Sequence, residues 1–367
     1  MQRRAMKNRA YNFGAGPAML PDALLLEAQA ELLNWQGEGM SVMEIGHRTP
    51  EYMALMEEIE ADFRELLAIP KNYTVLFIPS PGRTQFAMIP MNLLSAGQQG
   101  GYLVSGMWSA MALEEAEKLK LGYCVSSSED TGFTDIPSPS SWKLQENTAY
   151  LYFTANETVH GVRFAQTPHA ETIPLVADMT SCILSEPINV SDYGLIFAGA
   201  QKNISIPGLT IVIIRSDLLD KTPASTVPTM LDYRTHATHH SLYATPPAFN
   251  CYLAGKMFKW IKEQGGIKAL YKINCQKAAM LYDYIDNSSF YHCAVKPSSR
   301  SIMNVCFSLT QKELETEFLE QANQHGLYAL KGHRAVGGMR ASLYNAMPMA
   351  GVESLVAFMQ TFAKDHS

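Results

Sequence analysis

Short apolar runs of strand length, several of them separated by helical patterns, are the feature that most limits how this chain can fold. Strand-like runs at 73–78, 101–104 and 123–126 alternate with helical patterns at 84–94 and 108–120. Four more runs follow with no clear helix between them, apart from a candidate near 181–184; they cover 149–153, 173–177, 193–198 and 210–214. This order is typical of a mostly parallel sheet covered by helices, so we predict an α/β fold.

The pattern changes in the last third of the chain, where helices and strands segregate. Helical patterns lie at 249–263, 267–286, 311–324 and 352–364, and strand-like runs lie at 303–307 and 338–343. Two further helices are predicted near the start, at 21–35 and 50–67. We therefore predict a disordered extension over residues 1–10, a large domain over 11–260 and a smaller C-terminal α+β domain over 261–367. The first segment of the large domain could pack on the small domain.

Composition argues against several classes of protein. With 47% hydrophobic and 17% charged residues, the 367-residue chain has the composition of a packed globular protein. Its net charge of −6 argues against nucleic acid as a partner. No apolar run approaches the ~20 residues of a membrane-spanning helix, and no signal-peptide core follows the basic residues 1–9. Six cysteines without paired spacing indicate reduced thiols, so we expect a cytoplasmic protein without a membrane partner.

Two of the apolar runs end at residues that can carry chemistry. Asp178 follows the run 173–177, and Lys202 follows the run 193–200. In open α/β sheets, ligands bind beyond the carboxyl ends of the strands. An amine there could bond the aldehyde of pyridoxal 5′-phosphate (PLP), and an acid could hold the ring nitrogen of that cofactor protonated. Alternatively, Asp178 is a helix N-cap and Lys202 is a surface amine. The surrounding residues are needed to choose between these interpretations.

Other segments at predicted strand ends could complete such a site. The loop 80–84 joins a strand to a helix, an arrangement that binds anions through backbone amides. Because Pro81 has no amide hydrogen, a phosphate there would depend on Gly82 and Arg83. An ordinary turn is the alternative.

One ring and two polar side chains add to these candidates, namely Trp108, Thr158 and Gln201. The indole could stack on a pyridine ring, and the polar groups could bond the cofactor. The alternatives are a core tryptophan at position 108 and a turn-stabilising hydroxyl at Thr158.

Cationic residues indicate an anionic substrate. Arg340 lies at the start of an apolar strand, where an unpaired charge is costly and a carboxylate partner would be expected. Arg48 and the pair His333–Arg334 supply more positive charge than one carboxylate needs, which favours a substrate with a second anionic group such as a phosphate. Any of these arginines could instead form a surface ion pair.

Three histidines, His236, His239 and His240, have the spacing of metal ligands on a helix. The segment is expected to be a loop before Pro246, and it has no neighbouring acidic or cysteine ligand. We therefore predict no metal site.

Taken together, these motifs resemble the phosphoserine aminotransferase family, a class-V family of fold-type I, PLP-dependent enzymes. The resemblance covers nearly the whole chain from about residue 11. Its motifs lie at 12–21, 41–44, 47–48, 156–158, 193–203, 245–247, 330–334, 337–342 and 344–348.

The resemblance implies a role for each matching residue. Lys202 would bond the cofactor and Asp178 would pair with its ring nitrogen. Further cofactor contacts would come from Gly82, Arg83, Trp108, Thr158, Gln201, Ala244 and Thr245, with Thr245 reaching in from a second subunit of a homodimer. The substrate would be bound by Arg48, His47, His333, Arg334 and Arg340. Where the family commonly has asparagine and serine, this chain has Ala244 and Ala15.

The implied reaction is reversible transamination of 3-phosphohydroxypyruvate with L-glutamate, which gives phosphoserine and 2-oxoglutarate in serine biosynthesis. The resemblance also implies that the site can form 4-phosphohydroxy-L-threonine, a reaction that serves pyridoxine biosynthesis in some bacteria. Two alternatives remain open at this point: a sister transaminase acting on alanine and glyoxylate, and a PLP-binding protein without activity.

Overall fold

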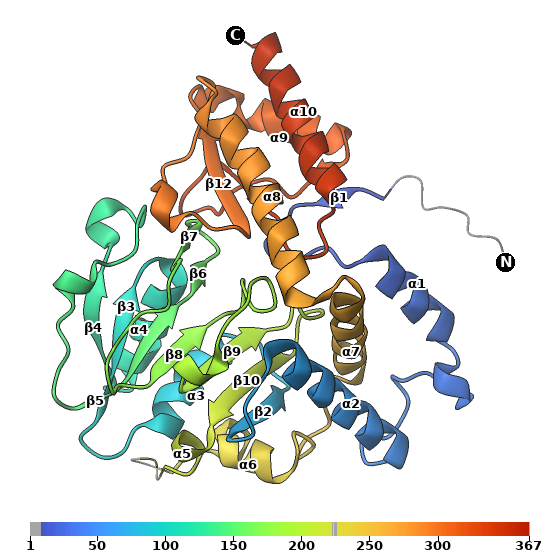
Figure 1. The fold of residues 1–367 in the computed structure, drawn as a ribbon, viewed down its shortest axis with the longest axis vertical. Helices are drawn as coiled ribbons and strands as arrows, with labels where there is room; N and C mark the ends of the chain where they lie inside the picture. The colour runs from blue at the N-terminus through green and yellow to red at the C-terminus, as the bar shows by residue number, and fades with distance from the viewer. Residues whose placement is uncertain (1–8, 222, 224–225, 367) are drawn as a thin grey trace.

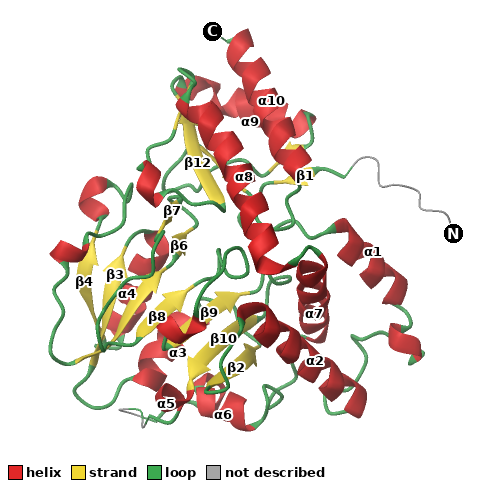
Figure 2. Ribbon diagram, in the orientation of Figure 1, coloured by secondary structure: helices red, strands yellow, loops and turns green. Residues whose placement is uncertain are grey.

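A computed structural model describes residues 9–221, 223 and 226–366. A seven-stranded sheet forms its centre (Figures 1 and 2). The strands, in spatial order, are β2 (Tyr73–Ile78), β10 (Thr210–Arg215), β9 (Leu195–Gly199), β8 (Leu175–Asp178), β5 (Thr148–Thr154), β3 (Gln99–Val104) and β4 (Gly122–Ser127). Only β10 runs against its neighbours, so the sheet is mostly parallel, as the alternating pattern predicted.

Alternate residues of these strands point into two apolar layers. On β10, Ile211 and Ile213 face one layer, whereas Val212 and Ile214 face the other. The helices that supply the first layer include α2 (Pro50–Leu67) and α7 (Ala248–Glu263). The second contains α3 (Thr84–Leu93), α4 (Met107–Lys118), α5 (Ser216–Leu219) and α6 (Tyr233–Thr238). Both faces of the sheet are therefore covered, which is why its strands are continuous apolar runs.

A third apolar cluster forms around the C-terminal sheet at the top of Figure 1. This sheet contains β11 (Tyr291–His292), β12 (Asn304–Leu309) and β14 (Met339–Ser342), packed with α8 (Gly266–Asp286), α9 (Glu315–Gln324) and α10 (Met349–Asp365). Phe13 belongs to this cluster, and β1 (Tyr11–Asn12) pairs with β13 (Leu327–Tyr328). Helix α8 contributes Ile267 to the core of the large sheet and Leu281 to the C-terminal core. The exact boundary at residue 260 stays a prediction, and residues 1–8 of the expected disordered extension lie outside the described residues.

Three local predictions were wrong. The segment 181–184 forms turns instead of a helix. The helix predicted over 21–35 ends earlier, as α1 (Asp22–Glu31), and a short 3₁₀ turn follows at Trp35–Gly37. The segment expected as a loop around His236 contains α6, because the Asp232 side chain accepts a hydrogen bond from the Arg234 amide and caps the helix. Also absent from the predictions is the hairpin of β6 (Asn156–Glu157) and β7 (Val162–Arg163).

Candidate active site

Asp178 and Lys202 line one cavity at the carboxyl ends of the parallel strands. Asp178 is the last residue of β8, and Lys202 follows β9 by three residues. The cavity measures about 360 Å³ and contains nine of the predicted residues: Gly82, Arg83, Trp108, Thr158, Asp178, Gln201, Lys202, His333 and Arg340. The strand order therefore assembles groups that are up to 258 positions apart, from Gly82 to Arg340.

Lys202 is held inside the protein with its amine directed at a hydroxyl. Its side chain is 7% exposed, and Nζ donates to Thr158 Oγ1 at 2.6 Å. Burial lowers the pKa of Lys202 from 10.5 to about 8, although the nearby Asp178 charge opposes this shift. The Arg340 charge adds to the lowering. The amine is consequently a better nucleophile and proton acceptor near neutral pH than a surface lysine would be.

Asp178 is also buried, with 6% of its surface exposed. Burial raises the pKa of this carboxyl, while hydrogen bonding to Thr180 acts in the other direction. Asp178 Oδ1 accepts from the Thr180 amide at 2.8 Å, and Thr180 Oγ1 in turn accepts from the Gly199 amide at 3.1 Å. This chain of bonds ties the ends of β8 and β9 together and fixes the direction of the carboxylate.

The same cavity also offers donors for an anion. In the described part of the chain, the amides of Gly82 and Arg83 have no protein acceptor, and both residues lie directly before α3. A helix N-terminus with free amides favours negative charge. The Arg83 guanidinium lies 4.8 Å from the centre of the Trp108 ring, so a positive charge and an aromatic face border the same space.

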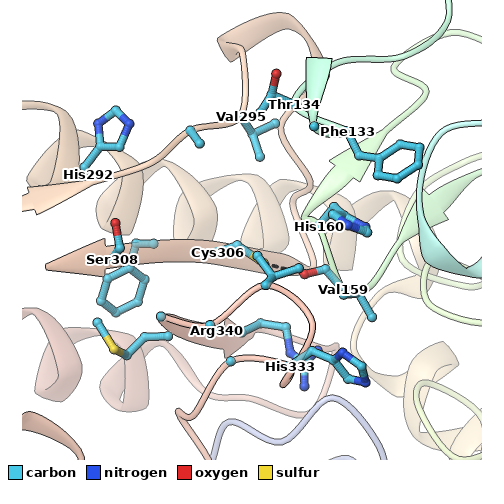
Figure 3. A pocket seen from close by; sticks show the side chains of 18 of the residues that line it. Phe133, Thr134, Val159, His160, His292, Val295, Cys306, Ser308, His333 and Arg340 are labelled. Atoms are coloured by element: carbon cyan, nitrogen blue, oxygen red, sulfur yellow. Dashed lines mark hydrogen bonds between the residues drawn. The ribbon is translucent and has the colours of Figure 1, made fainter. Parts of the chain in front are cut away.

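Arg340 and His333 also line the cavity. Arg340 Nη1 approaches the Thr158 carbonyl oxygen at 3.5 Å, while its buried Nε has no partner among the described residues. Burial and the charges of Arg340, Arg334 and Arg83 lower the pKa of His333. The positive charges of these three arginines favour the binding of an anion. Figure 3 shows the same two side chains beside a second cavity of about 310 Å³, with His160 and Val159 facing them.

Five predicted residues do not line the cavity: His47, Arg48, Ala244, Thr245 and Arg334. Arg48 and Thr245 are exposed, and neither lines the cavity that contains Lys202. Sequence reasoning in turn missed cavity residues such as Thr180 and Ser181, whose only signal was their position directly after β8. Among the described residues, no three acidic, cysteine or histidine side chains come together as metal ligands.

The residues present fit pyridoxal phosphate. A buried amine and a buried carboxylate line the same cavity as the free amides before α3, and the buried indole Nε1 of Trp108 has no partner in the described chain. The sequence profile of the class-V aminotransferases matches residues 10–355. The fold and the site therefore define a PLP-dependent aminotransferase of fold type I.

Similar proteins identify the family within this class of aminotransferases. Phosphoserine aminotransferase of Legionella pneumophila (strain Philadelphia 1) is 60% identical over 361 residues, which cover 98% of this chain and all of the relative. A solved phosphoserine aminotransferase from Bacillus circulans subsp. alkalophilus has 45% identity and a TM-score of 0.95, covering 98% of this chain and 99% of that one. A PLP-bound phosphoserine aminotransferase from Trichomonas vaginalis has 38% identity and a TM-score of 0.93, covering 96% and 100%. The chain belongs to the phosphoserine aminotransferase family.

Proposed function

We propose that this enzyme transfers the amino group of L-glutamate to 3-phosphohydroxypyruvate, giving O-phospho-L-serine and 2-oxoglutarate, and thereby acts in serine biosynthesis. The observation that carries the proposal is the excess of positive charge beside Lys202. Arg340 can clamp an α-carboxylate, and Arg83 and His333 line the same cavity, which leaves a second positive charge and an imidazole group for a phosphate. The names of the relatives support the same substrates.

Bound PLP would withdraw electrons from the α-carbon of the substrate. The Asp178 carboxylate would pair with the ring nitrogen, and the amides of Gly82 and Arg83 would bind the cofactor phosphate. Lys202 Nζ would remove the proton from the α-carbon and later return it, as general base and then acid. The Thr158 hydroxyl, 2.6 Å from Nζ, orients that amine.

We further propose a homodimer whose active sites lie at the subunit interface. Arg48 and Thr245 are exposed, and apolar side chains are exposed near both of them in sequence. These side chains are Met40, Met43 and Met53 near the first residue, and Met230 and Tyr243 near the second. Exposed apolar side chains on the segments that carry proposed site residues would be covered by a second copy of the chain.

Two finer parts of the proposal concern a second substrate and location. A phosphate subsite does not depend on the rest of the carbon chain, so we propose 4-phosphohydroxy-L-threonine as a further product, which would add a role in pyridoxine biosynthesis.

We propose the cytoplasm as the location because all six cysteines are unpaired. No helix among the described residues combines the length and hydropathy needed to cross a bilayer.

The test is a competition between amino donors. The PLP-loaded protein is mixed with 2-oxoglutarate and either phosphoserine or alanine, and glutamate formation is followed. We expect kcat/KM to be at least about 100-fold higher with phosphoserine, because a site built for a polar group rejects a substrate that lacks it. Activity with alanine alone would assign the chain to the sister transaminases, and bound PLP without turnover would leave a non-catalytic protein.

A matched variant locates the phosphate preference. His333→Ala should lower kcat/KM for phosphoserine far more than for alanine, since only the former carries a phosphate. Equal losses for both donors would contradict the role of His333.

A further inference from the structure

Glu157 is a buried acid that the proposed reaction does not use. It lies in β6 between Asn156 and Thr158, and its side chain is fully buried. Burying a carboxylate is costly unless hydrogen bonds compensate for the lost water. The partners of Glu157 therefore indicate why the fold keeps an acid at this position.

Within the described part of the chain, every hydrogen bond of the Glu157 side chain goes to the beginning of α4. Oε2 accepts from the Trp108 amide at 3.0 Å, and Oε1 accepts from the Ser109 amide at 2.8 Å and the Ser109 hydroxyl at 2.6 Å. The N-cap residue of α4 is Gly106, which has no side chain to satisfy these amides. Glu157 therefore caps a helix from about 50 positions away in the sequence.

Its neighbours on the turn strengthen this arrangement. His160 Nδ1 accepts from the Met107 amide at 3.4 Å, so the first three amides of α4 all meet side chains of the segment 157–160. The positive end of the helix dipole faces the carboxylate, which is the favourable orientation. Space is tight here, because a Cβ on Gly106 would lie 2.6 Å from Glu157 Cδ.

The residue directly after this two-residue strand bonds the reactive amine. Thr158 accepts from Lys202 Nζ at 2.6 Å, directly after Glu157 fixes the backbone of Trp108. The Trp108 ring lines the cavity, and no other side chain among the described residues bonds its amide. The consecutive residues Glu157 and Thr158 thus connect the aromatic wall of the site to the lysine.

From this geometry we propose that Glu157 is a positioning residue, which holds the Trp108 ring in the orientation that stacks on the bound cofactor. The proposal rests on the PLP site described above. Glu157 itself makes no contact with the cofactor in this account and acts through the start of α4.

The test is a double-mutant cycle on PLP affinity, measured by titrating PLP into the apo-protein. Glu157→Gln keeps the shape of the side chain but turns an amide N–H₂ toward one of the helix donors. We expect PLP to bind about tenfold more weakly, because one aromatic stacking interaction contributes about this much affinity. Trp108→Leu should cause a similar loss, and the double variant should lose little more than either single variant.

Two further measurements separate positioning from a general structural role. The circular dichroism band of bound PLP reports the asymmetry of its surroundings and should shrink in Glu157→Gln at saturating PLP. Asp62→Asn removes a partly buried carboxylate of α2 that pairs with Lys262 of α7, outside both α4 and the β6–β7 hairpin, so it should leave PLP affinity and this band unchanged. If Glu157→Gln fails to fold, Gly106→Ala displaces the same carboxylate without deleting it and should give the same pattern.

Additive losses in the cycle, or unchanged PLP affinity and spectrum in a folded Glu157→Gln protein, would overturn the proposal. Because these readouts need no substrate, a wrong substrate assignment would leave them intact. Failure of the wild-type protein to bind PLP would refute the cofactor site itself.

Discussion

At the scale of single residues, the site depends on two buried groups of opposite charge. Burial disfavours the charged form of each, while their mutual attraction favours it. For Lys202 burial prevails, and its pKa falls to about 8. The surrounding protein therefore prepares the amine for reaction before any ligand binds.

This shift predicts how attachment of PLP to the apo-protein depends on pH. Only the unprotonated amine attacks an aldehyde, so the rate should rise with pH and level off above about 8. An amine with an unshifted pKa of 10.5 would keep accelerating beyond pH 9. Stopped-flow absorbance at saturating PLP measures the profile, and continued acceleration above pH 9 would contradict the depressed pKa.

Asp178→Asn should reduce kcat by roughly 10²–10⁴-fold, the range seen when an acid–base group is removed. An amide cannot stabilise a positive charge on the ring nitrogen as a carboxylate does. Steady-state kinetics with phosphoserine give the result, and Asp192→Asn, a change at an exposed acid, is the control. Equal activity of both variants would remove Asp178 from the mechanism.

At the scale of elements, the loop 332–338 presents His333 to the cavity. The Gly332 amide donates to the Gly338 carbonyl oxygen at 2.8 Å and closes the loop. A Cβ on Gly332 would lie 2.1 Å from the Gly337 carbonyl oxygen, so only glycine fits without a change of the loop.

Gly332→Ala should therefore displace His333 and lower kcat/KM for phosphoserine by about 100-fold, as displacements of about 1 Å can do. Gly337→Asn is the matched control, because this position has open space and asparagine tolerates its positive φ of 79°. Thermal unfolding should change little in either variant, since the loop is largely exposed. Similar kcat/KM values for the two variants would contradict the argument.

The lengths of the elements also explain which parts of the site could be predicted from the sequence. Each long strand has enough apolar residues to be recognised, and parallel strands end at one edge, so Asp178, Lys202 and Trp108 could be placed together in advance. Strands of two residues, such as β6, carry no periodicity. The cap that Glu157 provides for α4 depends on tertiary packing, and no local pattern indicated it.

At the scale of the whole molecule, the proposed dimer would bring Arg48 and Thr245 to a site that a single chain leaves without them. A dimer of this chain has a mass of 81.4 kDa, twice the 40.7 kDa of one copy. Light scattering after size exclusion should give this value, and a monomer mass for the active enzyme would refute the interface.

Subunit mixing tests whether Arg48 acts across that interface. Lys202→Ala and Arg48→Gln homodimers should each be nearly inactive, but their heterodimer contains one site with both residues intact. Random reassortment should therefore restore about a quarter of wild-type activity. No recovery, with exchange verified by mass spectrometry, would indicate that each chain supplies its own Arg48.

The central claim is that Lys202 carries the cofactor. A useful comparison is Lys277, which is also buried and whose pKa burial lowers to about 7. The Lys277 amine donates to the carbonyl oxygens of Leu343, Tyr344 and Met347, so it has a structural role that occupies all three of its hydrogens. A low pKa alone therefore does not identify the reactive lysine.

The most direct measurement is reduction of the PLP-loaded protein with borohydride, followed by proteolysis and mass spectrometry of the peptides. Reduction makes the bond between cofactor and lysine permanent. We predict a pyridoxyl group on the peptide containing Lys202 and an unmodified peptide containing Lys277. Modification of Lys277 or another lysine, with Lys202 unmodified, would contradict the account.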